Sequence, residues 1–152
     1  MDFAALQEKM AIAVSCFKSN DSELLNFDEL DLPERPISHR LGFYFPTLFN
    51  GYDVDCEYNK HLGGRKMEGI PDIVMHKRHS DERDLLAVEV KARRNRDEFS
   101  RRQDKGEILN DYHKLRQYTT PEGLRYSWGA FVLIMLDEII VEWLRMGRRC
   151  SG

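Results

Sequence analysis

Apolar residues recur along this chain with two periods, and each change of period marks an expected helix or strand. From Phe3 to Phe17 they return every three or four residues, which is typical of an amphipathic helix. A second helix is expected from about Pro33, because proline fits the first turn of a helix, and Asp31 is its candidate cap. Pro46 should end this second helix, since proline has no N–H for the helical ladder.

Further along, short runs that alternate with period two or stay continuously apolar predict strands. These runs are residues 50–58, 70–76, 85–92, 126–136 and 139–146. The last of them fits either a strand or a short helix. Helical spacing returns over residues 103–118. The order of two helices, three strands, a helix and two strands predicts an α/β fold with a central sheet, and the absence of repeats predicts one domain over residues 1–152.

Length and composition exclude several classes of protein. The chain has 152 residues, 41% of them hydrophobic and 32% charged, which is unlike a disordered or collagen-like sequence. No apolar run approaches the ~20 residues of a membrane span, and the N-terminus lacks the pattern of a secretory signal. The three cysteines are widely spaced, so neither a zinc site nor a disulfide framework is expected. We therefore expect a soluble, cytoplasmic protein with no membrane partner.

The net charge of −3 means that any binding of nucleic acid must use a local basic patch. Residues 91–105 include seven basic residues and only three acidic ones. The candidates for phosphate contacts are Arg93, Arg94, Arg96, Arg101 and Arg102. The simpler alternative is that this run is a solvated loop and helix face.

Three residues of the second and third predicted strands could form a reactive site. Glu89 and Lys91 are two residues apart, so their side chains should point to one face of the sheet, and Asp72 should lie near Glu89 if the two strands pair antiparallel. Two converging carboxylates suit Mg²⁺ or Mn²⁺, and a neighbouring lysine could position water or offset charge on a phosphorane. The alternative is an ordinary Glu89–Lys91 ion pair on a solvated face.

The Pro-Asp pair at residues 71–72 and the Glu-Val-Lys triplet at residues 89–91, with the order of elements around them, resemble the PD-(D/E)xK nuclease superfamily. The resemblance covers about residues 33–137 and leaves a helix over residues 1–20 as an N-terminal addition. It implies a restriction-endonuclease-like α-β-β-β-α-β core with a mixed central sheet flanked by helices. It also implies a metal site of Asp72 and Glu89 with the Val90 carbonyl, and Lys91 as the catalytic lysine.

Members of the superfamily often add a glutamate from the helix before the sheet, and Glu34 stands where that residue is expected. An acid in a first helical turn is also favoured by the helix dipole alone, so both interpretations of Glu34 stay open. The resemblance also makes Lys114 and Gln117, from the helix after the triplet, minor candidates. Asp111 and Lys114 could equally form a simple pair three residues apart.

Other polar residues have simpler interpretations. His39 is expected on a helix face or in the core rather than at a metal, because no second histidine stands at ligand spacing. Asp53, Asp55 and Glu57 are expected on the solvent face of a strand.

Three functional classes follow from the sequence. The first is a metal-dependent nuclease that hydrolyses phosphodiester bonds of DNA or RNA with Mg²⁺ or Mn²⁺. The second is a catalytically inactive nuclease-like module for nucleic-acid binding or complex assembly. The third is an unrelated α/β interaction protein in which the motif is accidental. The modest basic patch favours a homodimer or a protein partner that completes the substrate groove.

Overall fold

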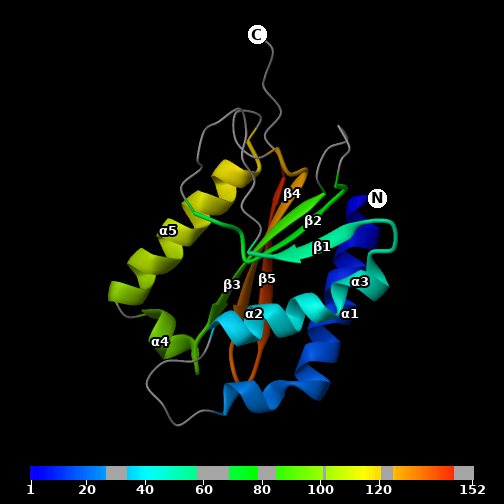
Figure 1. Cartoon of the computed structure of the whole chain (residues 1–152). Helices are drawn as coiled ribbons and strands as arrows, with labels where there is room; N and C mark the ends of the chain where they lie inside the picture. The colour runs from blue at the N-terminus through cyan, green and yellow to red at the C-terminus, as the bar shows by residue number, and fades with distance from the viewer. Residues whose placement is uncertain (27–33, 58–68, 79–84, 101, 121–124, 146–152) are drawn as a thin grey trace.

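A five-stranded mixed sheet lies between helices on its two faces (Figure 1). The computed structural model describes residues 1–26, 34–57, 69–78, 85–100, 102–120 and 125–145. The strands are β1 (Asp53–Cys56), β2 (Ile73–His76), β3 (Leu86–Ala92), β4 (Trp128–Ile134) and β5 (Ile139–Arg145), and they lie in the order β1-β2-β3-β4-β5. The predicted α/β class with a mixed central sheet flanked by helices is therefore confirmed.

Only β3 and β4 pair in parallel; the other neighbours are antiparallel. Parallel strands need a crossover, and here the connection between them includes α4 (Arg96–Ser100) and α5 (Arg102–Tyr118). Helix α5 packs against β3 and β4. The run at residues 139–146, which the sequence left open, is the strand β5.

The remaining helices lie on the opposite face of the sheet from α5 (Figure 1). They are α1 (Phe3–Asn20), the short 3-10 helix η1 (Ser22–Leu25), α2 (Glu34–Phe43) and α3 (Phe45–Leu48). Strand alternation divides the core accordingly. Val88 and Val90 belong to the apolar cluster with α1 and α2, whereas Ala87 belongs to the cluster with α5. Because Glu89 and Lys91 share the alternation of Ala87, they point toward α5.

The N-terminal half differs from the sequence prediction at Pro46. Helix α2 ends at Phe43, and Pro46 lies in the first turn of the separate helix α3, so it begins a helix rather than simply ending one. Proline fits this position because the N–H that it lacks would have no helical partner in a first turn. Asp31, Pro33, the turn over residues 79–84 and the break over residues 121–123 fall outside the described residues. Helix α4 was not predicted, because its five residues carry no apolar period.

Within the ranges that the structure describes, no helix is long and apolar enough to cross a membrane.

Candidate active site

Asp72 and Glu89 meet across the antiparallel pair of β2 and β3. The register sets Ile73 opposite Val88, so Asp72, one residue earlier, faces Glu89. One carboxylate oxygen of Asp72, Oδ2, accepts a hydrogen bond from the Val90 backbone N–H at 2.7 Å. The side chain of Val90 itself lies in the apolar cluster on the other face. Local alternation thus brings two acidic side chains to the face covered by α5, close to one backbone position.

Glu89 is buried and Asp72 is half-buried, and neighbouring negative charges act on both carboxyl groups. Glu89 is only 7% exposed, and burial, together with the negative charges of Asp72 and Asp111, raises its pKa to about 9. For Asp72, burial is again the largest cause; the Val90 hydrogen bond opposes it, and the pKa rises to about 6. Glu89 Oε1 is fully buried and has no hydrogen-bond partner in the described part of the chain. Such a buried oxygen is costly unless something binds it.

Lys91 extends from the same strand face into a ring of carboxylates. Its Nζ lies 3.1 Å from Asp111 Oδ2, 3.5 Å from Glu34 Oε1 and 3.8 Å from Glu107 Oε2, and only 12% of its side chain is exposed. Burial lowers the pKa of Lys91, but Glu34 and Asp111 outweigh burial, so its pKa lies above the ordinary value. Lys91 therefore keeps its positive charge among these three carboxylates.

Glu34 lies at this cluster, although it comes from α2 on the opposite layer. Its Oε2 accepts a hydrogen bond from the Ala92 backbone N–H at 3.1 Å, and its Oε1 faces Lys91. Arg93 approaches the same carboxylate at 3.7 Å and bonds Glu107 at 3.0 Å. Because Glu34 bridges to β3, its position is better explained by these contacts than by the helix dipole alone.

Helix α5 adds three residues that the sequence did not assign to the cluster. Asp111 contacts Lys91 and also Lys114, at 3.2 Å, so it is more than a local helix pair. Glu107 lies one turn earlier and Tyr118 one turn after Lys114. The available signal was the spacing of three or four residues between the polar side chains of residues 107–118, whereas the sequence-based interpretation covers only Asp111, Lys114 and Gln117 on this helix.

Tyr118 lies beside Glu89 with its hydroxyl buried and without a partner of ordinary hydrogen-bond geometry in the described residues. Burial is the main cause of its raised pKa, followed by the charges of Glu89 and Asp72. Gly69 passes over this hydroxyl so closely that a Cβ there would lie 2.8 Å from it, and its φ of +86° also favours glycine. The segment before Asp72 is thereby held against α5.

The donor set fits a hard cation. The oxygens of Asp72 and Glu89 converge, Glu89 Oε1 has no partner, and both pKa values are raised by burial. Mg²⁺ is commonly bound by one or two carboxylates with waters and substrate oxygens filling its other positions. No group of three or more His, Cys, Asp or Glu side chains is preformed around a metal position in the ranges described. A cation here would therefore rely on two carboxylates, a backbone oxygen and water.

The other predicted residues are distributed around this centre. Lys114 contacts Asp111, whereas Gln117 is exposed on α5. In the basic run, Arg93 is engaged by Glu34 and Glu107, and Arg96 pairs with Glu138. Arg101 falls outside the described residues, and only the backbone of Arg102 is described. The role of the run in binding phosphate stays a prediction.

The first strand is less solvated than the sequence suggested. Asp55 bonds the buried His76 at 2.6 Å and also pairs with Arg78, so it is not a free solvent-face residue. The reason is diagonal contact between neighbouring strands, which a single strand cannot reveal. Glu57 bonds Arg35 and lies 3.8 Å from His39, which is half exposed on α2. These contacts stabilise the β1 edge, and the Glu57 backbone N–H also donates a hydrogen bond to the Asp72 carbonyl at 3.0 Å.

Comparison with known proteins gives a fold and no family. No protein-family model matches the chain, and no curated protein matches it. Among solved structures, the crystal structure of SSO0001 is similar over 95% of this chain and 77% of that chain, with a TM-score of 0.50 and 17% sequence identity. At this identity the likeness concerns the fold alone.

Proposed function

We propose that this chain is a metal-dependent nuclease of the PD-(D/E)xK type, which hydrolyses phosphodiester bonds of DNA or RNA. The observation that carries the proposal is the convergence of the half-buried Asp72 and the buried Glu89, whose Oε1 has no hydrogen-bond partner among the described residues. The charged Lys91 extends from the same face of β3 as Glu89. A purely structural pair would be expected to satisfy its buried oxygens, as the Asp21 carboxylate does with Arg40 and Tyr44.

The order of elements supports the same proposal at the level of the fold. From α2 through β1, β2, β3, α5 and β4, the chain follows the α-β-β-β-α-β order of a restriction-endonuclease-like core. Asp72 directly precedes β2, Glu89 lies on β3, and Glu34 of α2 bonds the Ala92 backbone N–H of the same strand β3. The resemblance implies acidic residues at these three positions. Fold-level analogy raises the expectation of nuclease chemistry, but the reactive side chains carry the argument.

Each residue of the cluster has a role in this proposal. Asp72, Glu89 and the Val90 carbonyl would hold Mg²⁺ or Mn²⁺, which supplies Lewis-acid activation of water and neutralises phosphate charge when bound. Lys91 orients the attacking water and stabilises negative charge that develops on the phosphate. Glu34 and Asp111 hold Lys91 in its charged form and fix its direction, so they act on the reaction through Lys91.

Contacts to the nucleic-acid backbone are proposed for the basic run after β3. Arg96 is largely exposed and its pairing with Glu138 is at the surface, where phosphate can compete for the guanidinium. Arg94, Arg101 and Arg102 extend the same run. Arg93 is better suited to ordering Glu34 and Glu107, because only 16% of its side chain is exposed.

The proposal is tested by incubating the protein with single-stranded, duplex and structured DNA and RNA in Mg²⁺ or Mn²⁺. We expect cleavage of at least one substrate class, and its loss in Asp72→Asn and Glu89→Gln. Lys91→Ala should also reduce cleavage. Its matched control is Lys18→Ala, which changes an exposed lysine on α1. Metal binding without cleavage of any substrate by the wild-type protein would instead support the inactive binding module.

A further inference from the structure

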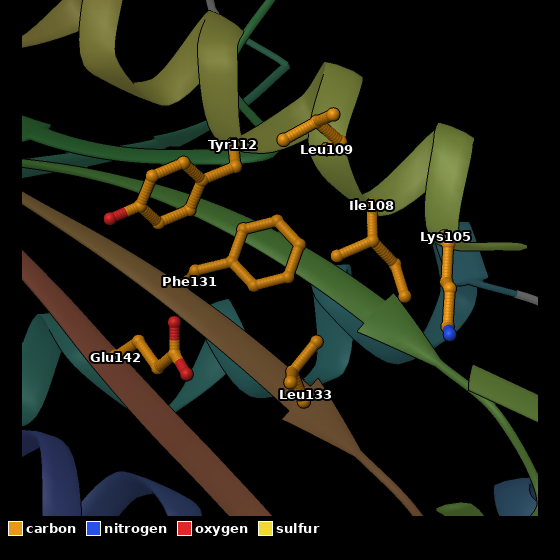
Figure 2. Close-up of a pocket in the computed structure, with 7 residues that line it drawn as sticks. All are labelled: Lys105, Ile108, Leu109, Tyr112, Phe131, Leu133 and Glu142. Atoms are coloured by element: carbon orange, nitrogen blue, oxygen red, sulfur yellow. The ribbon is translucent and has the colours of Figure 1, made fainter. Parts of the chain in front are cut away.

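Helix α5 has a second flank, which faces away from the candidate active site. On this side α5, β4 and β5 enclose an open groove of about 400 Å³ (Figure 2). Ile108, Leu109 and Tyr112 come from α5, and Phe131 and Leu133 come from β4. Tyr112 and Phe131 meet edge to face, with ring centroids 6.3 Å apart, and form the floor. The groove is therefore an apolar surface with well-defined walls.

The groove exists because α5 covers only part of its face of the sheet. The helix packs against β3 and β4, and the sheet ends at β5. On the same face as α5, β5 presents Ile140, Glu142 and Leu144, which are half-buried or exposed. Leu109 stands out from α5 with 56% of its surface exposed. The surface thus combines a protruding apolar side chain with an apolar hollow, and exposed patches of this kind often mark interaction sites.

Two opposite charges lie at separate positions on the rim. Figure 2 shows Lys105 at one end of the groove and Glu142 on the side toward the other end, with the apolar residues between them. Both side chains are exposed, and neither forms a salt bridge within the described part of the chain. With a cation at one end, an anion at the other and apolar residues between them, the surface is complementary to the same surface of a second copy rotated by 180°.

We propose that this surface, formed by α5, β4 and β5, joins two copies of the chain about a two-fold axis. The axis passes through the apolar middle of the groove, so Lys105 of each copy faces Glu142 of the other. Leu109 of each copy enters the hollow beside Phe131 of the other. A two-fold interface uses the same patch on both copies, and each contact therefore occurs twice. The proposal does not depend on the nuclease activity, because none of these side chains belongs to the Asp72–Glu89 cluster.

Charge exchange tests the pairing directly. The association of the full chain is measured by sedimentation equilibrium for the wild type, Lys105→Glu, Glu142→Lys and the double exchange. Each single reversal places like charges together twice, so we expect the dimer dissociation constant to rise about tenfold or more. The double exchange restores opposite charges and should return the constant to within about threefold of the wild type.

Matched controls separate this pairing from a general effect of net charge. Lys18→Glu and Glu8→Lys make the same charge changes at exposed positions of α1, on the other side of the sheet, and should leave association unchanged. Leu109→Asp should also abolish the dimer, and its circular dichroism spectrum should remain that of a folded chain, because Leu109 is exposed. A monomeric wild type, or a double exchange that fails to restore association, would overturn the proposal. A monomeric chain that binds an unrelated protein through this groove would also overturn the proposal.

Discussion

Two acidic residues of this molecule, Asp21 and Glu89, have similarly little exposed surface but differ in how their carboxyl groups are satisfied. Asp21 is 4% exposed and Glu89 is 7% exposed. The Asp21 carboxylate accepts hydrogen bonds from Arg40, at 2.7 Å, and from the Tyr44 hydroxyl. Glu89 Oε1 has no such partner among the described residues. Burial alone therefore does not decide whether a carboxyl group is satisfied within the chain.

The pKa directions of the two clusters follow from this difference. Burial raises the pKa of Asp21, but the bonds from Tyr44 and Arg40 outweigh it, and the pKa lies below its ordinary value. At Glu89, burial is reinforced by the neighbouring charges of Asp72 and Asp111, and the pKa rises to about 9. The Asp21 carboxylate has its partners within the chain, whereas at Glu89 the charge of Lys114 opposes the rise in pKa without overcoming it. This contrast is the physical basis of the proposed metal site.

The largest expected effect concerns cleavage. Lys91→Ala should reduce the cleavage rate by about 10²–10³-fold, by analogy with the loss of one electrostatic donor in other enzymes. The rate is measured in Mg²⁺ or Mn²⁺ and normalised to the folded fraction from circular dichroism, because Glu34 and Asp111 lose their shared cation in this variant. Asp21→Asn, normalised in the same way, should cleave like the wild type. Equal rates for wild type and Lys91→Ala would disprove the proposed role of the lysine.

Metal binding should stabilise the folded protein through the Asp72–Glu89 pair and not through Asp21. At Mn²⁺ concentrations about 100 times the dissociation constant, the folded state gains ~2.7 kcal/mol. For a chain of this size, that gain corresponds to a rise of roughly 5–10 °C in the thermal midpoint. The shift should persist in Asp21→Asn and disappear in Asp72→Asn, as followed by differential scanning calorimetry. If the thermal midpoint of Asp72→Asn still rose with Mn²⁺, the metal would bind elsewhere than at this pair.

Without metal, replacing the carboxylate by an amide should lower the free energy of unfolding more at Asp21 than at Glu89. Asp21→Asn removes the charge that holds Arg40 and Tyr44, so the free energy of unfolding should fall by about 1–3 kcal/mol. Glu89→Gln replaces a buried, incompletely bonded carboxyl group by an amide of similar volume, and we expect a change of about 1 kcal/mol or less. Urea unfolding in the presence of a chelator measures both values. A loss at Glu89 as large as that at Asp21 would identify Glu89 as a structural partner.

The smallest effect is the response to acid. Because the folded-state pKa of Asp21 is below that of the unfolded chain, its contribution to stability is present above pH ~4 and is lost as the pH falls through the folded-state pKa. Asp21→Asn should therefore lie below the wild type in stability at pH 6, and the gap should narrow below pH ~4. Urea midpoints measured from pH 6 to pH 2.5 test this. A gap that stays constant over that range would mean that the Asp21 charge contributes nothing.

Much of the fold could be predicted from local patterns. The period of three to four residues found α1 and α5, and short alternating or continuously apolar runs found β1 to β4 to within a few residues. Pro46 misled the prediction because proline is compatible both with the end of one helix and with the start of the next. Helix α4 is too short for any period to be detected. Short elements depend on their neighbours more than on their own sequence.

Within the candidate site, the sequence by itself determined that Glu89 and Lys91 share one face, because side-chain direction along a strand follows from local backbone geometry. The antiparallel register of β2 and β3 decided that Asp72 lies opposite Glu89. Only the tertiary structure decided that Glu34 reaches Ala92 from 58 residues away, and that Asp111 turns toward Lys91. It also decided that Asp55 pairs with His76 instead of facing solvent. Contacts between separate elements depend on how helices pack on the sheet, and that packing is a property of the whole core rather than of any one segment.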